Sequence, residues 1–439
     1  MRPLPLSRLC ACGACDLLLP RPEPAVGEIA TCPRCGHRLY KPKPDSPNRV
    51  LALVLTGLML YPMAIFLPLM TLDNLGMSES ASVFDSCLAL WRNHYPDVAV
   101  VVLATAVVFP LVKLLLLAAI VLPLGLDAPR PSTARLLRLH LHLEEWGMDE
   151  IYFLGILVTV VKITSMAHIE YDIGFWAFLG LTLLSIASIQ ALDREWCWQQ
   201  LRSHHLLPPP AGETLAVPGR GALVSGVLRC LDCGLLAACT EDDADRHAPR
   251  RCRRCGAALH PRKPASLERT WALLVTAVIL ALPANLLPIM RVDRLGSSER
   301  STIMDGIVYF FKAGDYTVGI VIFVASMLVP LFKIFGMVIV LLTIGARQAA
   351  SQRQKTIMFH FIEFIGRWSL LDIFVIALLQ ALVHFGSLTS IQADTASRYF
   401  AGVVVTTMLA AKTLDVRLLW DRPRLRRGRP RDVCAPVGT

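Results

Sequence analysis

Eight of the 13 cysteines form two sets of paired Cys-x-x-Cys motifs, and the chemistry typical of that pattern is metal binding. The two pairs of a set are separated by 16 residues in the first set and by 18 in the second. Four thiolates on two short loops suit tetrahedral zinc and close its coordination shell, so no position is left for a catalytic water. The sequence therefore predicts two structural zinc ions per chain. The ligands would be Cys12, Cys15, Cys32 and Cys35 in the first set, and Cys230, Cys233, Cys252 and Cys255 in the second.

Two other kinds of chemistry fit the same spacing. Iron in a rubredoxin-like site comes second, and a redox dithiol or disulfide comes third. A disulfide fits least, because the topology derived below places both sets in the reducing cytoplasm. Each cysteine segment has only about 40 residues, too few to bury a self-sufficient core, so a bound metal would supply much of its folding free energy.

A second group of chemically capable residues lies inside apolar segments. Lys113 and Lys333 each stand three residues after a proline, in the matching motifs Pro110-Leu-Val-Lys113 and Pro330-Leu-Phe-Lys333. A lysine near the middle of a membrane span costs about 2.5–3.5 kcal/mol on insertion scales, so we expect each to face a polar interior. Snorkelling toward the membrane surface is the alternative.

Other polar residues are expected to join these lysines. In the second repeat Asp372 is the natural counter-ion for Lys333, and the matching positions of the first repeat are less polar. The predicted cluster is therefore Ser326, Lys333, Ser369, Asp372 and Thr407. The secondary candidates are Lys113, Glu150, Lys162 and His384.

The cysteine sets and the lysine motifs recur together after about 220 residues, which identifies an internal repeat. The stretch Met63–Met70 recurs in the same way as Pro283–Met290. Prolines interrupt the apolar segments at corresponding places. Such interruptions either border a cavity or are packed kinks without function, and the sequence leaves both readings open.

The elements that position these residues are membrane helices. The chain is 54% hydrophobic and 18% charged, with a mean hydropathy of +0.52, which is too apolar for ordinary soluble domains. We expect an all-α polytopic membrane protein, a tandem parallel repeat of four transmembrane helices, each preceded by a small zinc-ribbon or rubredoxin-like cytoplasmic domain. Apolar runs of about 20 residues, enough to cross a bilayer, lie near 50–70, 98–126, 151–168, 174–192, 271–290, 316–344, 370–386 and 399–414.

The predicted topology places both termini and both zinc domains in the cytoplasm. The first 49 residues hold no apolar core of a secretory signal, and most Lys and Arg fall on the side of the cysteine sets. The net charge of +10 and the basic tail are read as topology determinants resting on anionic lipid rather than as a nucleic-acid site. The expected domains are 1–46 (zinc), 47–200 (membrane), 201–264 (linker and zinc), 265–421 (membrane) and 422–439 (tail).

The sequence offers no support for an enzyme: we find no nucleotide-binding loop, no nucleophile with a base and no metal set with an open position. Three functions remain. Paired interrupted helices around polar residues, together with the resemblance described next, favour a lipid transporter. The alternatives are a zinc-dependent membrane scaffold or redox sensor and, third, an ion or drug exporter.

These motifs together resemble the paraquat-inducible protein A family. The resemblance rests on the paired cysteine motifs, the two Pro-Leu-x-Lys motifs, Trp368-Ser-Leu-Leu-Asp372 and, most specifically, the terminal stretch Thr407–Asp421. It implies a component of the bacterial inner membrane that passes phospholipid to or from a periplasmic MCE-domain tunnel and so maintains the integrity of the envelope. It also implies that the polar cluster of the second repeat takes part in transport.

Overall fold

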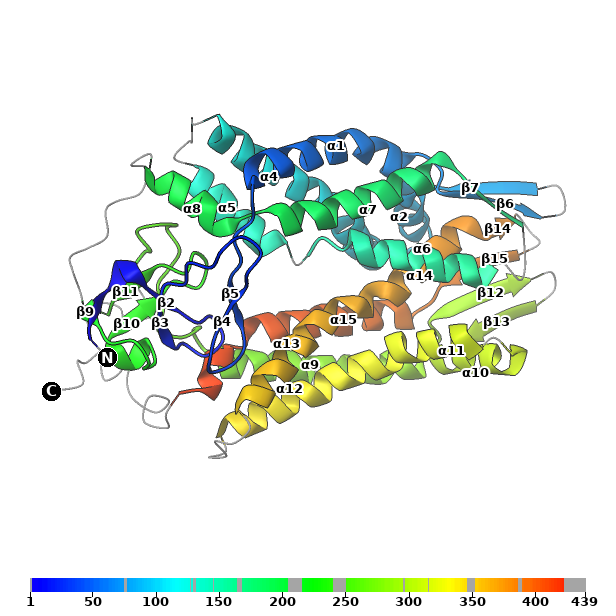
Figure 1. The fold of residues 1–439 in the computed structure, drawn as a ribbon. Helices are drawn as coiled ribbons and strands as arrows, with labels where there is room; N and C mark the ends of the chain where they lie inside the picture. Colours follow the sequence, from blue (N-terminus) through cyan, green and yellow to red (C-terminus); the bar gives the residue numbers. More distant parts are fainter. Residues whose placement is uncertain are drawn as a thin grey trace.

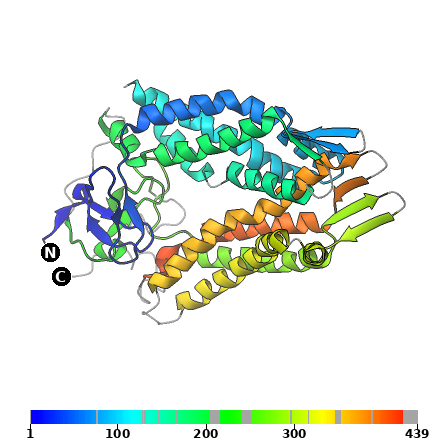
Figure 2. The same cartoon turned by 45° about the vertical axis from the view of Figure 1, so that its right-hand side comes forward.

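The computed structural model describes residues 2–74, 77–126, 128, 132–144, 146–163, 168–203, 215–239, 250–294, 297–314, 316–345, 352–385 and 389–421. The predicted tail at 422–439 and parts of the predicted linker at 201–264 lie outside these residues. The molecule is elongated (Figure 1). Both cysteine-containing domains lie at one end, β-hairpins lie at the other, and two sets of helices run side by side between them (Figures 1 and 2).

The helices repeat in the same order in two units. The first unit contains α1 (Ser46–Phe66), α2 (Val83–Arg92), α3 (Pro96–Val102), η2 (Leu103–Val108), α4 (Phe109–Gly125), α5 (Thr133–Leu143), α6 (Asp149–Ile163), α7 (Ile173–Ala191) and α8 (Arg194–Ser203). The second unit contains α9 (Ser266–Leu286), α10 (Ile303–Ala313), α11 (Tyr316–Ile322), η5 (Phe323–Leu328), α12 (Val329–Gly345), α13 (Gln352–Gly366), η7 (Arg367–Leu370), α14 (Leu371–Leu382), α15 (Ala396–Thr413) and η8 (Val416–Leu419). The internal repeat seen in the sequence is therefore also a structural repeat.

Five helices in the described part of the chain are long and apolar enough to cross a membrane, against the eight predicted. They are Ser46–Phe66, Pro96–Gly125, Ile173–Ala191, Ser266–Leu286 and Gly319–Ile344, and they confirm five of the predicted spans. The predicted spans at 151–168 and 370–386 correspond to α6 and α14, which have only 15 and 12 residues. A helix of 15 residues is about 22 Å long, short of the hydrocarbon thickness of about 30 Å.

The expectation of an all-α fold is wrong at the hairpin end. In the first unit β6 (Met70–Asn74), β7 (Met77–Ala81) and β8 (His168–Tyr171) form a sheet in the order β7-β6-β8. In the second unit β12 (Met290–Arg294), β13 (Ser297–Ser301), β14 (His384–Phe385) and β15 (Thr389–Ala393) form the order β13-β12-β15-β14. Residues assigned to span ends, such as His168 and His384, lie in these strands, which is why α6 and α14 end early.

Short strands also build the two cysteine-containing domains, which we call the first knuckle (residues 2–45) and the second knuckle (residues 215–239 and 250–265). The first holds β1 (Leu4–Pro5), β2 (Leu9–Ala11), β3 (Leu18–Pro20), β4 (Ala30–Thr31) and β5 (Arg38–Tyr40). The second holds β9 (Leu215–Ala216), β10 (Val227–Arg229) and β11 (Leu236–Ala238). Because β1 pairs with β9, the knuckles share a two-stranded sheet.

The helices of a unit pack closely where small residues allow it. In the first unit α1 packs against α4 and α7, and a Cβ on Gly174 would lie 2.3 Å from the carbonyl oxygen of Pro68. In the second unit α9 packs mainly against α15. The two units meet through α6 and α14, where the rings of Tyr152 and Phe374 lie 5.1 Å apart.

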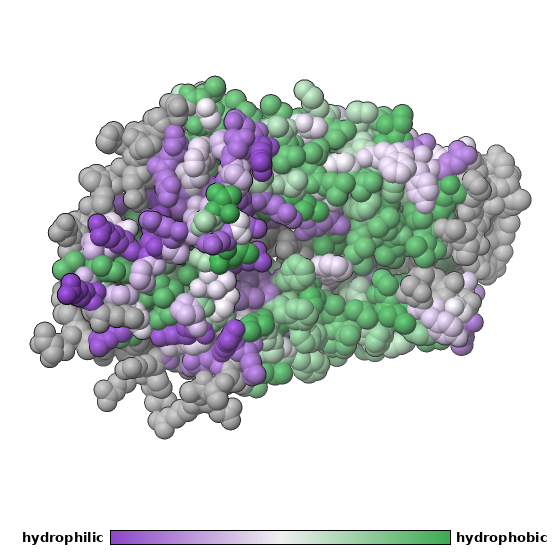
Figure 3. Space-filling model, in the orientation of Figure 1, coloured by the Kyte–Doolittle hydropathy of each residue, from purple (hydrophilic) through white to green (hydrophobic). Residues whose placement is uncertain are grey.

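The surface agrees with a membrane environment. Hydrophobic residues cover the middle of the molecule, and hydrophilic residues gather over the knuckles (Figure 3). Large side chains such as Met59 on α1, Leu286 on α9 and Phe335 on α12 are exposed. A contiguous exposed apolar belt is costly in water and stable against lipid tails. The protein is therefore a multi-pass membrane protein.

Candidate functional site

The structure brings each set of four cysteines together. Within each set the four Sγ atoms all lie within 4.8 Å of one another, and all eight cysteines are buried. The closest pairs are Cys12 with Cys35 and Cys15 with Cys32, both at 3.5 Å, and Cys233 with Cys252, also at 3.5 Å. Four sulfurs at about 2.3 Å from a tetrahedral ion would stand about 3.8 Å apart, so the donor sets fit a metal ion. The protein thus has two buried four-cysteine groups that could hold a metal.

Each Cys-x-x-Cys turn closes in the same way. The residue after the second cysteine has a left-handed backbone and donates its N–H to the carbonyl oxygen of the first cysteine, as Gly36 does to Cys32 at 2.8 Å. Glycine supplies this conformation at Gly36, Gly234 and Gly256 without a steric penalty. The fourth turn instead uses Asp16, at φ 60°. An aspartate tolerates this region, and its carboxylate gains a role of its own.

Asp16 holds the two knuckles and the second helical unit together. Its backbone oxygen accepts the N–H of Ala222 at 2.7 Å, and its carboxylate accepts Arg262 at 2.9 Å. Arg262 also contacts Asp421 at 2.6 Å, and Arg417 makes a buried ion pair with Asp415 at 2.7 Å. Burial disfavours the charge of Asp415, but the guanidinium of Arg417 holds its pKa below the ordinary value. The junction is therefore stabilised by buried ion pairs as well as by backbone hydrogen bonds.

Each knuckle docks on both helical units, and the contacts cross. The first knuckle places His37 against His360 of α13, with ring centroids 5.2 Å apart, and Arg34 over Trp420 at 5.7 Å. The second knuckle binds the first unit, where Arg254 lies 5.0 Å from the ring centroid of Trp198. The helix that follows the first knuckle packs in the first unit. Its first residue, Ser46, donates a hydrogen bond to the carbonyl oxygen of Ala191 at 2.8 Å.

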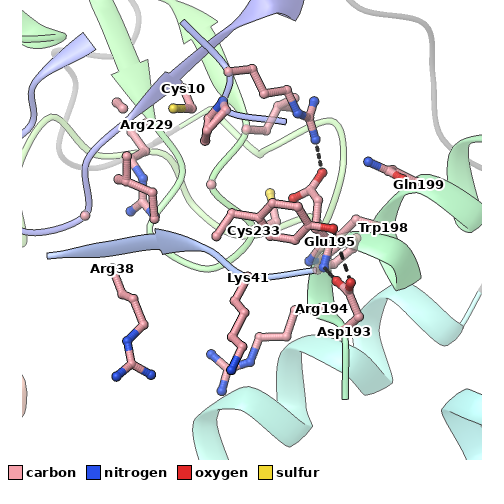
Figure 4. A pocket seen from close by; sticks show the side chains of 18 of the residues that line it. Cys10, Arg38, Lys41, Asp193, Arg194, Glu195, Trp198, Gln199, Arg229 and Cys233 are labelled. Atoms are coloured by element: carbon pink, nitrogen blue, oxygen red, sulfur yellow. Dashed lines mark hydrogen bonds and ion pairs between the residues drawn. The ribbon is translucent and has the colours of Figure 1, made fainter. Parts of the chain in front are cut away.

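A cavity of about 980 Å³ lies where the knuckles meet the end of the first unit (Figure 4). Its wall mixes charges of both signs. Arg38 and Lys41 extend from the strand β5 region, while Asp193 and Glu195 lie at the start of α8 (Figure 4). Tyr40 donates to the Asp193 carboxylate at 3.2 Å.

In the first unit the buried lysine has a carboxylate partner that the sequence reading missed. The Lys113 ammonium lies 3.2 Å from Asp149 Oδ1, and both side chains are nearly inaccessible. The sequence comparison of the two repeats had instead selected the neighbouring Glu150. This residue lies in the same helical turn as Asp149 but is only half-buried. The signal available in the sequence was the adjacent Asp149-Glu150 pair at the start of α6. Gly147 makes room for the ion pair, since a Cβ there would lie 2.6 Å from Lys113 Nζ.

His140, on α5, is a second buried group that the sequence reading missed. Its side chain is inaccessible to solvent, and neither ring nitrogen has a hydrogen-bond partner among the described residues. Burial lowers the pKa of His140 to about 4, and the nearby charges of Lys113 and Arg194 act in the same direction. The imidazole is therefore neutral at physiological pH.

The two Pro-Leu-x-Lys motifs follow π-helical segments at matching positions, η2 and η5. Proline lacks the N–H that would continue the helical ladder, and π-turns are often found at functional positions. In the first unit Tyr61 of α1 donates to the carbonyl oxygen of Val107 at 2.7 Å, which satisfies an acceptor of η2. The position 220 residues later is Ala281, which has no hydroxyl to do the same.

In the second unit the Lys333 ammonium donates to the carbonyl oxygen of Gly366 at 3.1 Å. It is 2% exposed, and no carboxylate of the described residues lies within ion-pair distance of it, so the expected pairing with Asp372 is not found there. Ser326 and Ser369 are buried, and their hydroxyls have no hydrogen-bond partner among the residues that the structure describes.

The elements of the predicted cluster converge on η7, which carries Ser369 and packs against η5, α12 and α15. These carry Ser326, Lys333 and Thr407. Thr407 is buried and donates to the carbonyl oxygen of Val404 in its own helix at 2.9 Å. Asp372 is half-buried in the first turn of α14. The side chains of Lys162 and His384 lie outside what the structure describes, so these two candidates stay predictions.

The sequence matches the protein family described as Paraquat-inducible protein A over residues 48–202 and 267–424, which confirms the resemblance noted from the motifs. These two segments correspond closely to the two helical units. No solved structure matches the chain.

Individual relatives cover almost the whole chain. The chain is 31% identical over 411 residues to the Intermembrane transport protein PqiA of Escherichia coli K12, covering 94% of this chain and 95% of that protein. It is 31% identical over 415 residues to the Lipophilic envelope-spanning tunnel protein A of the same organism, covering 93% and 90%. A Probable intermembrane transport protein of Haemophilus influenzae is 30% identical over 418 residues, covering 95% and 96%. All three are named for transport or for a tunnel across the envelope.

Proposed function

The chain belongs to the paraquat-inducible protein A family, and from that premise we propose that it is an intermembrane transport protein that carries phospholipid. In this proposal it sits in the bacterial inner membrane and passes lipid to or from a periplasmic MCE-domain tunnel. The relatives named for intermembrane transport support the transport class. The tunnel partner, the lipid cargo and the role in envelope integrity are our inference. No catalytic step is needed for this function.

The proposed metal is zinc, one ion in each four-cysteine group, with a structural role. Four buried thiolates close the shell of a tetrahedral ion, and the two knuckles share one small apolar cluster instead of each burying a core of its own. When bound, zinc would link the two Cys-x-x-Cys loops of a knuckle through its four thiolate ligands and so stabilise the fold. The chain's own contribution is to hold the knuckles at the junction of the two units.

The proposed topology keeps both knuckles and both termini in the cytoplasm and the hairpin sheets in the periplasm. Each unit crosses the membrane four times if a helix that is too short to span the bilayer forms one crossing together with the helix next to it in the chain. In the second unit α13, η7 and α14 follow one another without a break from Gln352 to Leu382, and α15 adds 18 residues. In this arrangement residues 47–200 and 265–421 are the membrane domains, and 1–46 and 201–264 carry the zinc sites.

The observation that carries the choice of a working site is the contrast between the two buried lysines. Lys113 is neutralised by Asp149, and Tyr61 satisfies the adjacent π-segment. Lys333 has only a backbone carbonyl oxygen as acceptor among the described residues. The elements η5 and η7, which pack against its helix, carry two buried hydroxyls with unused hydrogen-bonding capacity. Unused polar capacity inside a membrane protein is costly and is typical of a site that binds or moves a polar group. We therefore place the lipid headgroup path, or a proton that drives it, at Ser326, Lys333, Ser369, Asp372 and Thr407.

A photocrosslinking experiment in living cells tests this function. A small diazirine-bearing residue at the buried Met337, one helical turn after Lys333, should form adducts with radiolabelled phospholipid, and Lys333→Met should abolish them. The same probe at the exposed Phe335 contacts bulk lipid and should label equally in both backgrounds.

Equal labelling at Met337 with and without Lys333 would argue against a lipid path at this lysine. Labelling from Phe335 alone would favour the scaffold function, in which the helices only anchor the knuckles.

A further inference from the structure

Arg229 lies between the two four-cysteine groups although it belongs to the second knuckle. It is the last residue of β10 and immediately precedes Cys230. A Cβ built on Gly13, in the first knuckle, would lie 3.4 Å from Arg229 Nη2 and 3.6 Å from Nη1. A Cβ built on Gly234 would lie 3.6 Å from the same Nη2. The guanidinium therefore touches one Cys-x-x-Cys turn of each knuckle.

Arg229 lines the cavity at the junction, and no Asp or Glu of the described residues forms an ion pair with it. Asp16 acts on its charge only from a longer distance. Asp16, the acidic residue at this junction, is held by Arg262 at 2.9 Å and lies 3.9 Å from Arg417. Figure 4 shows Arg229 on the same cavity wall as Cys10 of the first knuckle and Cys233 of the second.

Loading the cysteine sets with metal would add negative charge next to Arg229. Four thiolates around a divalent ion carry a net charge of about −2. Two loaded centres would then place like charges on either side of the junction, and each would be destabilised by the other. A guanidinium is the side chain best suited to lie between them, because it is planar, permanently charged and weakly hydrated.

We propose that Arg229 is the shared counter-cation of the two metal–thiolate centres, so that one residue of the second knuckle sets the metal affinity of the first knuckle as well. At both glycines an added Cβ would be in ordinary van der Waals contact with the guanidinium, which places it against both turns. This inference rests on the metal occupancy proposed above and goes beyond it. It makes the two centres one electrostatic unit rather than two independent sites.

The test follows metal loss at each centre separately in the full-length, detergent-purified protein. Metal content is measured first, and the protein is then challenged with a chelator and a thiol-alkylating reagent. Mass spectrometry of peptides reports the alkylation rate of Cys12, Cys15, Cys32 and Cys35 separately from that of Cys230, Cys233, Cys252 and Cys255. Arg229→Gln should weaken metal binding at both centres by about tenfold or more, the size typical of outer-shell partners.

Arg253→Gln is the matched control. It removes the same charge from the same knuckle, between Cys252 and Cys255, but from an exposed side chain. It should leave the first centre unchanged. Arg229→Lys keeps the charge in a more compact head and should lie between the unaltered protein and Arg229→Gln. It also serves as the second variant if Arg229→Gln does not accumulate.

Faster metal loss confined to the second centre in Arg229→Gln would overturn the proposal and leave only a local structural role. An equal effect of Arg253→Gln at the first centre would do the same, because bulk charge would then suffice. An unaltered protein without bound metal would overturn both this inference and the proposed zinc sites. Normal metal content with no response at the first centre would overturn this inference alone.

Discussion

At the scale of single residues, the same lysine motif has different partners in the two repeats. Lys113 faces Asp149 at 3.2 Å, whereas Lys333 donates to the carbonyl oxygen of Gly366. A buried ion pair is a poor source of stability compared with apolar packing, but removing one partner leaves an uncompensated charge. The two lysines should therefore respond differently to substitution.

Asp149→Asn should destabilise the protein by about 3–5 kcal/mol, because it leaves the Lys113 ammonium buried without a counter-charge. The double variant Lys113→Met/Asp149→Leu removes both charges and should recover most of that loss. Thermal unfolding in detergent measures both. A double variant as unstable as the single one would contradict a structural role for the pair.

Gly147→Ala should also destabilise the first unit, by about 1–3 kcal/mol, since overpacking displaces the Lys113 side chain from Asp149. The added Cβ would lie 2.5 Å from Lys113 Cε. Gly125→Ala is the matched control, because nothing lies within 4 Å of a Cβ built there. Thermal midpoints that do not distinguish the two variants would show that the close approach is relieved elsewhere.

The two four-cysteine groups could be predicted from the sequence, because paired Cys-x-x-Cys motifs at this spacing are typical of a single metal site. The polar residues of the second unit could be selected from the sequence by their polarity, but the contacts that they make could not be predicted. Asp149 and Arg229 escaped detection for the same physical reason. Their partners, Lys113 and Gly13, are distant in the chain, and only the packing of separate elements brings them together.

At the scale of elements, sequence periodicity identified the long apolar helices and missed what connects them. The start of β8 at His168 and the whole of β14 were read as the ends of spans, because a short strand next to an apolar helix resembles its continuation. Helices such as α5 were missed because only one face is apolar. That face nevertheless buries His140 against the first unit.

His140 should make the stability of the first unit depend on pH. Its pKa in the folded protein, about 4, is below the value of about 6.5 in an unfolded chain, so proton binding favours unfolding. The stability is complete above about pH 6.5 and should fall as the pH decreases toward 4, by at most about 3 kcal/mol.

Thermal unfolding between pH 7.5 and 5.5 measures this slope. His140→Phe should flatten it; Phe359 stands at the same distance, seven residues, before Gly366 as His140 does before Gly147. The control His142→Gln removes an exposed histidine of the same helix and should keep the slope. A slope unchanged by His140→Phe would assign the pH dependence to another group.

At the scale of the whole molecule, the knuckles join the two helical units at one end. The first knuckle contacts α13 through His37 and His360, and the second contacts α8 through Arg254 and Trp198. The knuckles therefore link the two units at this end, in addition to the direct contact between α6 and α14. Under the proposed structural role of zinc, the metal should control the rigidity of this end.

Removal of metal by a chelator should expose the backbone of η8 and α8 to solvent and leave α9 and α15 protected. Hydrogen exchange read by mass spectrometry measures this difference, because exchange reports local opening. Reloading with zinc should restore the protection. Equal exchange of η8 and α8 with and without metal would show that the docking does not depend on it.

In the proposed function Lys333 takes part in lipid transport, whereas Lys113 and Asp149 only stabilise the first unit. The most direct measurement compares envelope integrity in cells that depend on the plasmid-borne protein, with protein level and metal content checked for each variant. We expect loss of function for Lys333→Met and normal function for Lys113→Met/Asp149→Leu. Normal function of Lys333→Met at a normal protein level would contradict this proposal.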